Sequence, residues 1–262
     1  MSQTEARSES RPQPPAASVA QLDLEVIVPA FNEQKRIAPT LYALVKELQT
    51  LPLRSRVRVV DNGSSDLTAD TVERVRATLD TGLIALSGCS TRGKGSAVAK
   101  GILSSSATYV GFCDADLATP AAAIADAMRL LEEGWEVVIG SRHCAGAAYA
   151  TDQPLLRRLG SAAFRNATRA IAGGIQDTQC GFKFFTRGAA QRVFAHTRIT
   201  GFAFDLEVLA RAHALNLPVK EMPVCWSDQP GSTFSFRRDG FASFADLWDL
   251  RRAISENNAR HA

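Results

Sequence analysis

Residues 108–116 read TYVGFCDAD, an apolar run that ends in two aspartates separated by Ala115. Residues 57–64 read VRVVDNGS and have the same form, a β-branched run that closes on Asp61. Runs of this length and composition predict buried strands. Ligands of open α/β sheets bind just beyond the carboxyl ends of parallel strands, so we expect both acidic strings to line one crevice.

Strands and helices alternate on either side of these strings. Apolar runs predict strands at 24–28 (ended by Pro29), 57–60, 83–86, 108–113 and 136–139, and helical periodicity predicts helices at 39–51, 66–78, 94–104 and 121–132. This alternation predicts an α/β fold with a mainly parallel central sheet flanked by helices. Beyond Ser141 it breaks down, and we expect a helix at 155–172, strands at 181–185 and 219–224, and a C-terminal helix with Phe241, Phe244 and Trp248 on one face.

The chain of 262 residues, 45% of them hydrophobic, can bury the core of one large domain. Residues 1–21 are rich in Ser, Pro, Gln and Ala and predict a disordered leader, followed by the domain over 22–256 and a frayed tail over 257–262. No stretch approaches the roughly 20 apolar residues of a membrane span. The five scattered cysteines form no metal-binding or disulfide pattern and favour a reducing compartment.

The net charge of +3 hides an asymmetry. Residues 142–220 carry 11 Lys and Arg against 4 Asp and Glu, a local charge of +7, which leaves −4 for the rest. A basic half can dock an anionic partner, although an ordinary solvated surface has the same composition. The helix expected at 155–172 places Arg158, Arg165 and Arg169 on one face, which suits either a membrane surface or an ordinary surface helix.

Seven short sequence strings, in their order along the chain, resemble those of a known family. They are VPAFNE (28–33), DNGS (61–64), GKG (93–95), DAD (114–116), GSR (140–142), DTQCGFK (177–183) and GFAFD (201–205). Together they resemble the family 2 glycosyltransferases of the GT-A fold. The later strings are similar to those of the polyprenyl-phosphate, or dolichyl-phosphate, sugar synthases of the glucosyltransferase and mannosyltransferase branch. The resemblance covers about residues 24–252.

The resemblance implies a nucleotide-sugar site in the first half, residues 22–141. The residues assigned to it are Pro29, Ala30, Asn32, Glu33, Asp61, Gly63, Lys94, Asp114 and Asp116. Asp61 would accept hydrogen bonds from the base, or serve only as a turn residue before Gly63. Lys94 would approach the sugar nucleotide because its flanking glycines admit close backbone contact.

The resemblance also implies a divalent metal, Mg²⁺ or Mn²⁺, held by Asp114 and Asp116, with Asp116 the more direct ligand. The ion would neutralise charge on the departing diphosphate. Helix capping is the alternative for Asp116, since Pro120 follows closely. Some polyprenyl-phosphate mannosyltransferases carry a metal-contacting Gln two residues after the second Asp. Here Ala118 takes that place, so the coordination would rely more on water.

The implied acceptor is a polyprenyl monophosphate, docked by the second half, residues 142–256. Its second pKa lies near 6, so it is already a nucleophile at neutral pH and needs a cationic cradle, not a base. The resemblance assigns phosphate binding to Arg142, with a surface ion pair as its alternative, and to one of Arg157 or Arg158. Gln179 and Lys183 belong to the string that lines the site and are counted among the phosphate ligands, although Lys183 could equally be a charge at the end of a strand.

Two residues of the acceptor half keep alternative roles. Asp205 would be a catalytic base if the acceptor were a hydroxyl, or would orient the phosphate-binding arginines. Trp226 would stack on the sugar or only pack. The candidates for a catalytic role are therefore Asp116, Arg142 and Asp205.

The expected function is inverting transfer of a sugar from a UDP-hexose or UDP-N-acetylhexosamine, with GDP-mannose second, to a polyprenyl monophosphate. The enzyme would lie peripherally on the cytoplasmic face of a membrane, held by its basic helix and C-terminal aromatic face or by an integral-membrane partner. Two alternatives remain: transfer to a sugar hydroxyl of a glycolipid or polysaccharide, and a non-catalytic nucleotide-sugar-binding subunit. Nucleic-acid binding is not expected, because the basic region lacks interleaved exposed aromatic residues and any known nucleic-acid-binding motif.

Overall fold

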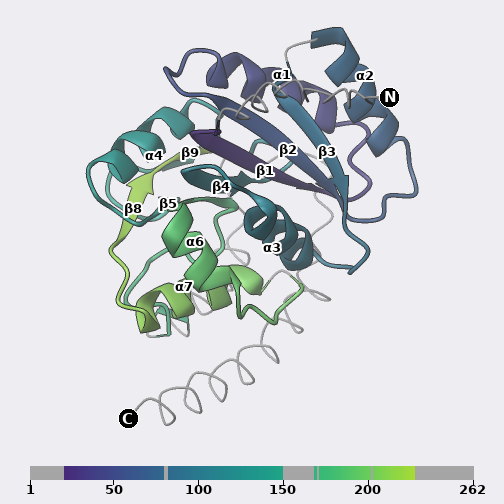
Figure 1. Cartoon of the computed structure of the whole chain (residues 1–262). Helices are drawn as coiled ribbons and strands as arrows, with labels where there is room; N and C mark the ends of the chain where they lie inside the picture. Colours follow the sequence, from purple (N-terminus) through teal and green to yellow (C-terminus); the bar gives the residue numbers. More distant parts are fainter. Residues whose placement is uncertain (1–20, 80–81, 150–167, 170, 202, 228–262) are drawn as a thin grey trace, which may run out of the picture.

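The computed structural model describes residues 21–79, 82–149, 168–169, 171–201 and 203–227 (Figure 1). The strands are β1 (Leu24–Ala30), β2 (Ser55–Asp61), β3 (Ile84–Gly88), β4 (Tyr109–Cys113), β5 (Val137–Ser141), β6 (Ala148–Tyr149), β7 (Phe182–Thr186), β8 (Val219–Pro223) and β9 (Cys225–Trp226). The helices are α1 (Ile37–Leu48), α2 (Thr68–Leu79), α3 (Lys94–Ser104), α4 (Ala123–Glu132), α6 (Arg187–Phe194) and α7 (Phe204–Ala214).

Seven strands form one sheet in the order β3-β2-β1-β4-β7-β5-β8, and β6 pairs with β9 in a small second sheet. All pairings in the large sheet are parallel except those of β7, which runs antiparallel to both β4 and β5. The predicted α/β fold with a mainly parallel sheet is therefore confirmed. Since only β7 is reversed, the other six strands bring their carboxyl ends to one edge.

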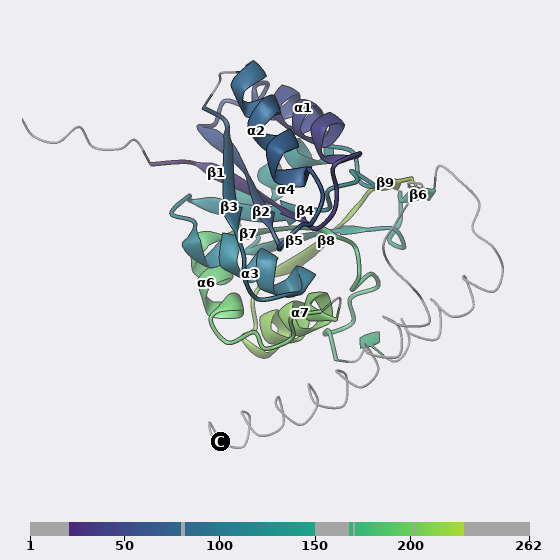
Figure 2. The same ribbon diagram turned by 90° about the vertical axis from the view of Figure 1, so that its right-hand side faces the viewer.

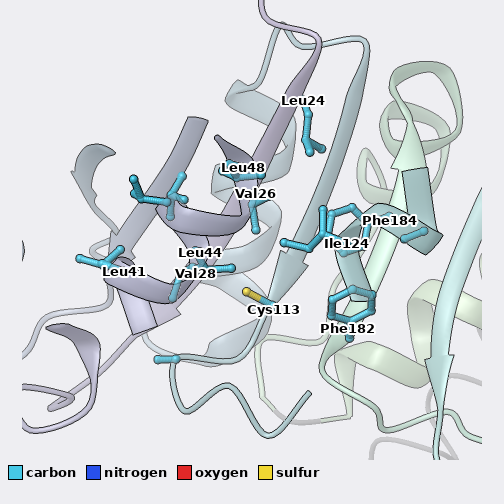
Figure 3. Close-up of a cluster of buried hydrophobic side chains, with 14 of the residues drawn as sticks. Leu24, Val26, Val28, Leu41, Leu44, Leu48, Cys113, Ile124, Phe182 and Phe184 are labelled. Carbon is cyan, nitrogen blue, oxygen red and sulfur yellow. The ribbon is translucent and has the colours of Figure 1, made fainter. Parts of the chain in front are cut away.

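Helices cover both faces of this sheet (Figure 2). The core on one face packs α1, α2 and α4 against inward side chains of β1 and β2, and the core on the other face packs α3, α6 and α7. Figure 3 shows the first core, in which Leu41, Leu44 and Leu48 of α1 approach Val26 and Val28 of β1. Alternation along β1 explains the layers, because its neighbour Ile27 belongs to the opposite core.

The predicted elements of the first half are confirmed to within a few residues, with one correction. We expected β1 to end before Pro29, but it continues to Ala30. The parallel ladder between β1 and β4 ends at the pair Ile27–Phe112, whereas pairing with β2 runs on to Asp61. Pro29 therefore lies beyond the ladder to β4, where its missing N–H is tolerated.

In the second half, the strands expected at 181–185 and 219–224 are confirmed as β7 and β8, but α6 and α7 were not predicted. The helix expected at 155–172 lies almost wholly outside the described residues, as does the C-terminal aromatic helix. All five cysteines are free. Within the described part of the chain, every helix is too short or too polar to cross a bilayer.

Candidate active site

The loops that follow β1 and β2 are joined by hydrogen bonds at the carboxyl edge of the sheet. Asn32 has a φ of 56°, its N–H donates to Ser64 Oγ at 3.0 Å, and its Oδ1 accepts from Ser65 N at 2.9 Å. The N–H of the next residue, Glu33, donates to Thr68 Oγ1 at 2.8 Å. The VPAFNE and DNGS strings therefore form one connected rim.

Asp61 ends β2 and folds the turn that follows it. Its Oδ2 accepts from the N–H groups of Gly63 at 3.3 Å and Ser64 at 3.2 Å, and its Oδ1 accepts from the Ser64 hydroxyl at 2.5 Å. Asn62 is 6% exposed and connects this turn to the start of α3, since its Oδ1 accepts from Gly93 N at 2.7 Å. The turn role of Asp61 is seen directly, and its contact with a base stays a prediction.

The acidic loop after β4 (residues 114–118) faces Lys94 at the start of α3. Lys94 Nζ lies 2.5 Å from Asp114 Oδ1. Burial alone would lower the pKa of Lys94, but the charges of Asp114 and Asp205 hold that pKa well above its usual range. Asp116 is half-buried, and burial followed by the negative charge of Asp114 raises its pKa.

A divalent cation fits this acidic pair. Asp114 and Asp116 present hard carboxylate oxygens, and the pKa of Asp116 is raised first by burial and then by the negative charge of Asp114, both of which a dication would offset. Among the described residues, no cluster of three or more His, Cys, Asp and Glu side chains is arranged to hold a metal. Mg²⁺ held by one or two carboxylates in proteins usually shares its coordination with water and substrate phosphates.

Three neighbouring elements hold the acidic loop in place. Thr40 on α1 donates its hydroxyl to Ala115 O at 2.6 Å. Gly181, just before β7, accepts the first N–H of the loop at 3.1 Å. Ser227, just after β9, donates to Ala118 O at 3.0 Å. The loop is therefore fixed by both halves of the chain.

Arg142, which follows β5, is fixed by the buried carboxylate of Asp177. Its Nε and Nη2 donate to the two carboxylate oxygens at 2.7 and 2.9 Å, and its backbone N–H donates to the same group at 2.9 Å. Its Cζ lies 5.4 Å from the ring centroid of Trp226. Burial alone would raise the pKa of Asp177, but the charge of Arg142 holds that pKa well below its usual range. Arg142 is therefore an oriented cation and not a loose surface ion pair.

Gly181 joins the acidic loop to this cation. A Cβ added at Gly181 would overlap the carboxylate of Asp114. Asp177, which holds Arg142, precedes Gly181 by four residues in the same string. Only a residue without a side chain lets the string that holds Arg142 lie directly against Asp114.

The structure places Lys183 and Asp205 beneath the site, which corrects the expectation that Lys183 binds the acceptor phosphate. Lys183 is 0% exposed, and its Nζ donates to Asp205 Oδ1 at 2.5 Å, Cys180 O at 2.6 Å and Thr178 O at 3.3 Å. These acceptors take all three hydrogens of its ammonium group. Asp205 is 2% exposed, and burial raises its pKa against the opposing charge of Lys183.

The glycines of the GKG string admit another segment of the protein, and their close approach to the sugar nucleotide stays a prediction. Gly93 has a φ of 121°, and a Cβ there would overlap Thr200 O. A Cβ on Gly95 would lie 2.6 Å from both Ile199 O and Phe204 Cβ. The N–H of Gly95 donates to Thr200 O at 2.8 Å.

Two side chains at this edge keep a buried nitrogen that has no partner among the described residues: Arg36 Nη1 and Gln179 Nε2. Arg36 donates to the carboxylate of Glu33 from Nε at 2.6 Å and from Nη2 at 2.7 Å. Burial raises the pKa of Glu33. The backbone N–H of Gln179 donates to Asp177 Oδ1 at 3.3 Å. Buried donors without partners are rare in folded proteins and are commonly satisfied by water or a bound group.

The sequence reasoning missed Arg36, and also a contact in which Arg92 Cζ lies 5.5 Å from the ring centroid of Phe31. The sequence contained a signal for both residues of this contact, since Phe31 lies inside the VPAFNE string and Arg92 directly precedes GKG. Arg157 and Arg158 lie outside the described residues, so their role stays a prediction.

Comparison with known proteins identifies relatives of this arrangement. A sequence model described as glycosyl transferase family 2 matches residues 25–194. A dolichyl-phosphate beta-glucosyltransferase from Dictyostelium discoideum is 36% identical over 221 residues, which cover 80% of this chain and 68% of that protein. The enzyme of the same name from Homo sapiens is 31% identical over 226 residues, with coverage of 80% and 68%.

Solved structures share the fold at much lower sequence identity. Glucosyl-3-phosphoglycerate synthase from Mycobacterium tuberculosis, in complex with Mn²⁺, UDP and glucosyl-3-phosphoglycerate, is 15% identical, with a TM-score of 0.66 and coverage of 92% of this chain and 86% of that one. The same enzyme with Mn²⁺, UDP-glucose and phosphoglyceric acid has a TM-score of 0.65. This likeness confirms the GT-A fold.

Proposed function

The chain belongs to glycosyltransferase family 2, and from that premise we propose that it transfers glucose from UDP-glucose to the phosphate of a polyprenyl lipid of the dolichyl-phosphate class. The products would be polyprenyl-phospho-glucose and UDP. The dolichyl-phosphate sugar synthase type is the one its relatives share by name. The solved neighbours with UDP or UDP-glucose support the choice of a uridine donor over GDP-mannose.

The observation that carries the choice of acceptor is the burial of Asp205. Transfer to a hydroxyl requires a base that reaches the acceptor proton, whereas a phosphate dianion requires none. Asp205, the candidate base in our sequence analysis, is 2% exposed and ion-paired with Lys183 at 2.5 Å. A carboxylate in this position supports a structural role for Asp205 and therefore a phosphate acceptor.

The donor half would bind UDP-glucose along the connected rim and the acidic loop. Asn32, Glu33 and Asp61 would contact the nucleoside, and Lys94 would set a positive charge beside the diphosphate. Asp114 and Asp116 would hold Mg²⁺ or Mn²⁺, which when bound neutralises charge on the diphosphate leaving group.

The acceptor half would hold the lipid phosphate in line with the anomeric carbon. Arg142, fixed by Asp177, would bind the phosphate, with Gln179 and one of Arg157 or Arg158 beside it. A phosphate oxygen forms the new bond to the anomeric carbon while the bond from that carbon to the diphosphate breaks. One displacement inverts the configuration, so an α-linked donor gives a β-linked product.

We place the reaction at the cytoplasmic face of a membrane, where the lipid acceptor is anchored. The five free cysteines support a reducing compartment. The basic helix expected at 155–172, or an integral-membrane partner, would hold the enzyme against the lipid surface.

The test is transfer from radiolabelled UDP-glucose, UDP-N-acetylglucosamine and GDP-mannose to a short polyprenyl phosphate. Purified protein is incubated with Mg²⁺ or Mn²⁺, with EDTA in a parallel reaction, and lipid is extracted into organic solvent. We expect label from UDP-glucose in the organic phase, lost with EDTA. Label from another donor, or label confined to a water-soluble acceptor, would overturn the assignment of donor or acceptor respectively.

A further inference from the structure

We propose that Glu207 is a positioning residue that, together with Arg211, fixes Lys94 against the acidic loop. It would act through the bracing loop, residues 196–200, which connects α6 to the start of α7. This inference rests on the proposed function only in taking Lys94 to serve the nucleotide diphosphate.

The carboxylate of Glu207 holds the middle of the bracing loop. Glu207 is 1% exposed, and its Oε2 accepts from the N–H groups of Arg198 at 2.9 Å and Ile199 at 2.8 Å. Two consecutive backbone donors on one carboxylate oxygen fix the orientation of both peptide groups. The loop backbone is therefore held by a side chain from the first turn of α7.

Arg211 completes the grip one helical turn further along. Its Nε and Nη2 donate to Glu207 Oε1 at 3.0 and 2.8 Å, and its Nη2 also donates to the carbonyl of His196. The pair therefore binds the bracing loop at its first residue and at its middle. Residues four apart on a helix lie on one face, so a single face of α7 carries the whole brace.

The bracing loop transmits this position to α3, which lies on the same side of the sheet as α7 (Figure 2). The carbonyl of Thr200, the last residue of the bracing loop, accepts the N–H of Gly95 at 2.8 Å. Carbonyl groups of the bracing loop occupy the space that a Cβ would need on either glycine of the GKG string. Lys94 lies between those glycines, so the loop sets the backbone position of the residue that reaches Asp114.

The first turn of α7 supports the same lysine directly. Lys94 Nζ lies 5.8 Å from the ring centroid of Phe204, the first residue of α7. The carboxylate of Glu207 is buried, whereas the side chain of Arg211 is 20% exposed. An ion pair with a buried member adds little net stability compared with apolar packing, which favours a role in the geometry that the pair imposes.

A double-mutant cycle between Glu207→Gln and Lys94→Ala tests the inference. The affinity of the four proteins for UDP with Mn²⁺ is measured by calorimetry, and kcat and KM for UDP-glucose are measured beside it. We expect Glu207→Gln to weaken binding and raise the donor KM about tenfold in the wild-type background, and to add almost nothing once Lys94 is absent.

Glu25→Gln is the matched control. Glu25 is a 0% exposed carboxylate at the start of β1, paired with Arg56 and Arg58 at 2.8 and 2.9 Å, at the end of the strand opposite the site. We expect a lower Tm from this variant, with unchanged affinity and kcat. If Glu207→Gln does not fold, as judged by circular dichroism, Arg211→Lys replaces it in the cycle, with a smaller effect of the same sign.

The outcomes separate two kinds of failure. Equal losses from Glu207→Gln with and without Lys94 would mean that Glu207 only stabilises the fold, and the positioning role would be overturned. Failure of the wild-type protein to bind UDP with Mn²⁺ would instead overturn the proposed function.

Discussion

At the scale of single residues, the site contains charges that cost stability for the sake of chemistry. The carboxylate of Asp116 is the clearest case, since burial and its neighbour Asp114 raise its pKa. A raised pKa means that the ionised form is disfavoured in the folded chain. The resulting cost is present at neutral pH and disappears as the pH falls through the raised pKa and the group takes up a proton.

We therefore predict that Asp116→Asn raises the Tm of the metal-free protein at pH 7 while it lowers sugar transfer at least about 100-fold. The gain in Tm should disappear as the pH falls through the raised pKa of Asp116 and the wild-type carboxylate takes up a proton. Thermal melts in EDTA at several pH values, beside the extraction assay, measure both effects. An unchanged or lower Tm at pH 7 would contradict the prediction.

The residue scale also shows what the sequence could not reveal. The sequence showed that Arg142 and Asp177 belong to informative strings, but it did not show that these two residues, 35 positions apart in the chain, form an ion pair. Lys183 and Asp205 pair across 22 positions. Because no local periodicity encodes such distant pairs, the sequence predicted Lys183 as a phosphate ligand, whereas the folded chain buries it under three acceptors.

At the scale of elements, the first half was predictable because each helix shows a buried and an exposed face. In α1, for example, Leu41, Leu44, Val45 and Leu48 are buried, with exposed residues between them. In α7, every residue from Phe204 to Ala210 is buried, including Asp205 and Glu207. A helix buried on all sides has no amphipathic period, so its pattern did not predict it.

α6 escaped prediction for another reason. It has eight residues and begins directly after β7, without a loop. Its start is marked only by Thr186, whose side-chain oxygen accepts from Ala189 N at 3.3 Å. An N-cap of this kind is a weak signal when the same residue ends a strand.

We predict that Thr186→Ala destabilises the protein by about 1 kcal/mol, because the first turn of α6 loses its cap. Thr186→Ser should retain most of the stability, since its hydroxyl can accept the same N–H group. Urea denaturation measures the difference. Because Thr186 lies at the carboxyl end of β7, away from the acidic loop, kcat and KM should not change.

At the scale of the whole molecule, the dependence of stability on pH reflects two kinds of carboxylate: those whose pKa is lowered in the folded chain and those whose pKa is raised. Asp177 has a pKa well below its ordinary value of 3.8, because Arg142 favours its charged form. Its contribution is therefore present above that ordinary value and is lost as the pH falls toward the lower folded value. Asp205 and Glu33, with raised pKa values, give the opposite slope above their ordinary values.

We predict that Asp177→Asn lowers the free energy of unfolding at pH 7 by on the order of 3 kcal/mol, because Arg142 loses its buried partner. The variant should also lose stability less steeply than the wild type below about pH 4. Chemical denaturation across pH 2 to 7 measures both quantities. Parallel curves for the two proteins would show that the low pKa of Asp177 does not drive acid unfolding.

The placement of β7 between β4 and β5 has a consequence for biosynthesis. The sheet neighbours of β5 are β7 and β8, so residues 137–141 leave the ribosome before either neighbour has been made. One edge of β4 stays open until residues 182–186 arrive. A nascent chain with unpaired strands invites aggregation or chaperone capture. The halves that we assigned to donor and acceptor therefore cannot fold one after the other, because the sheet is complete only when β7 inserts between β4 and β5.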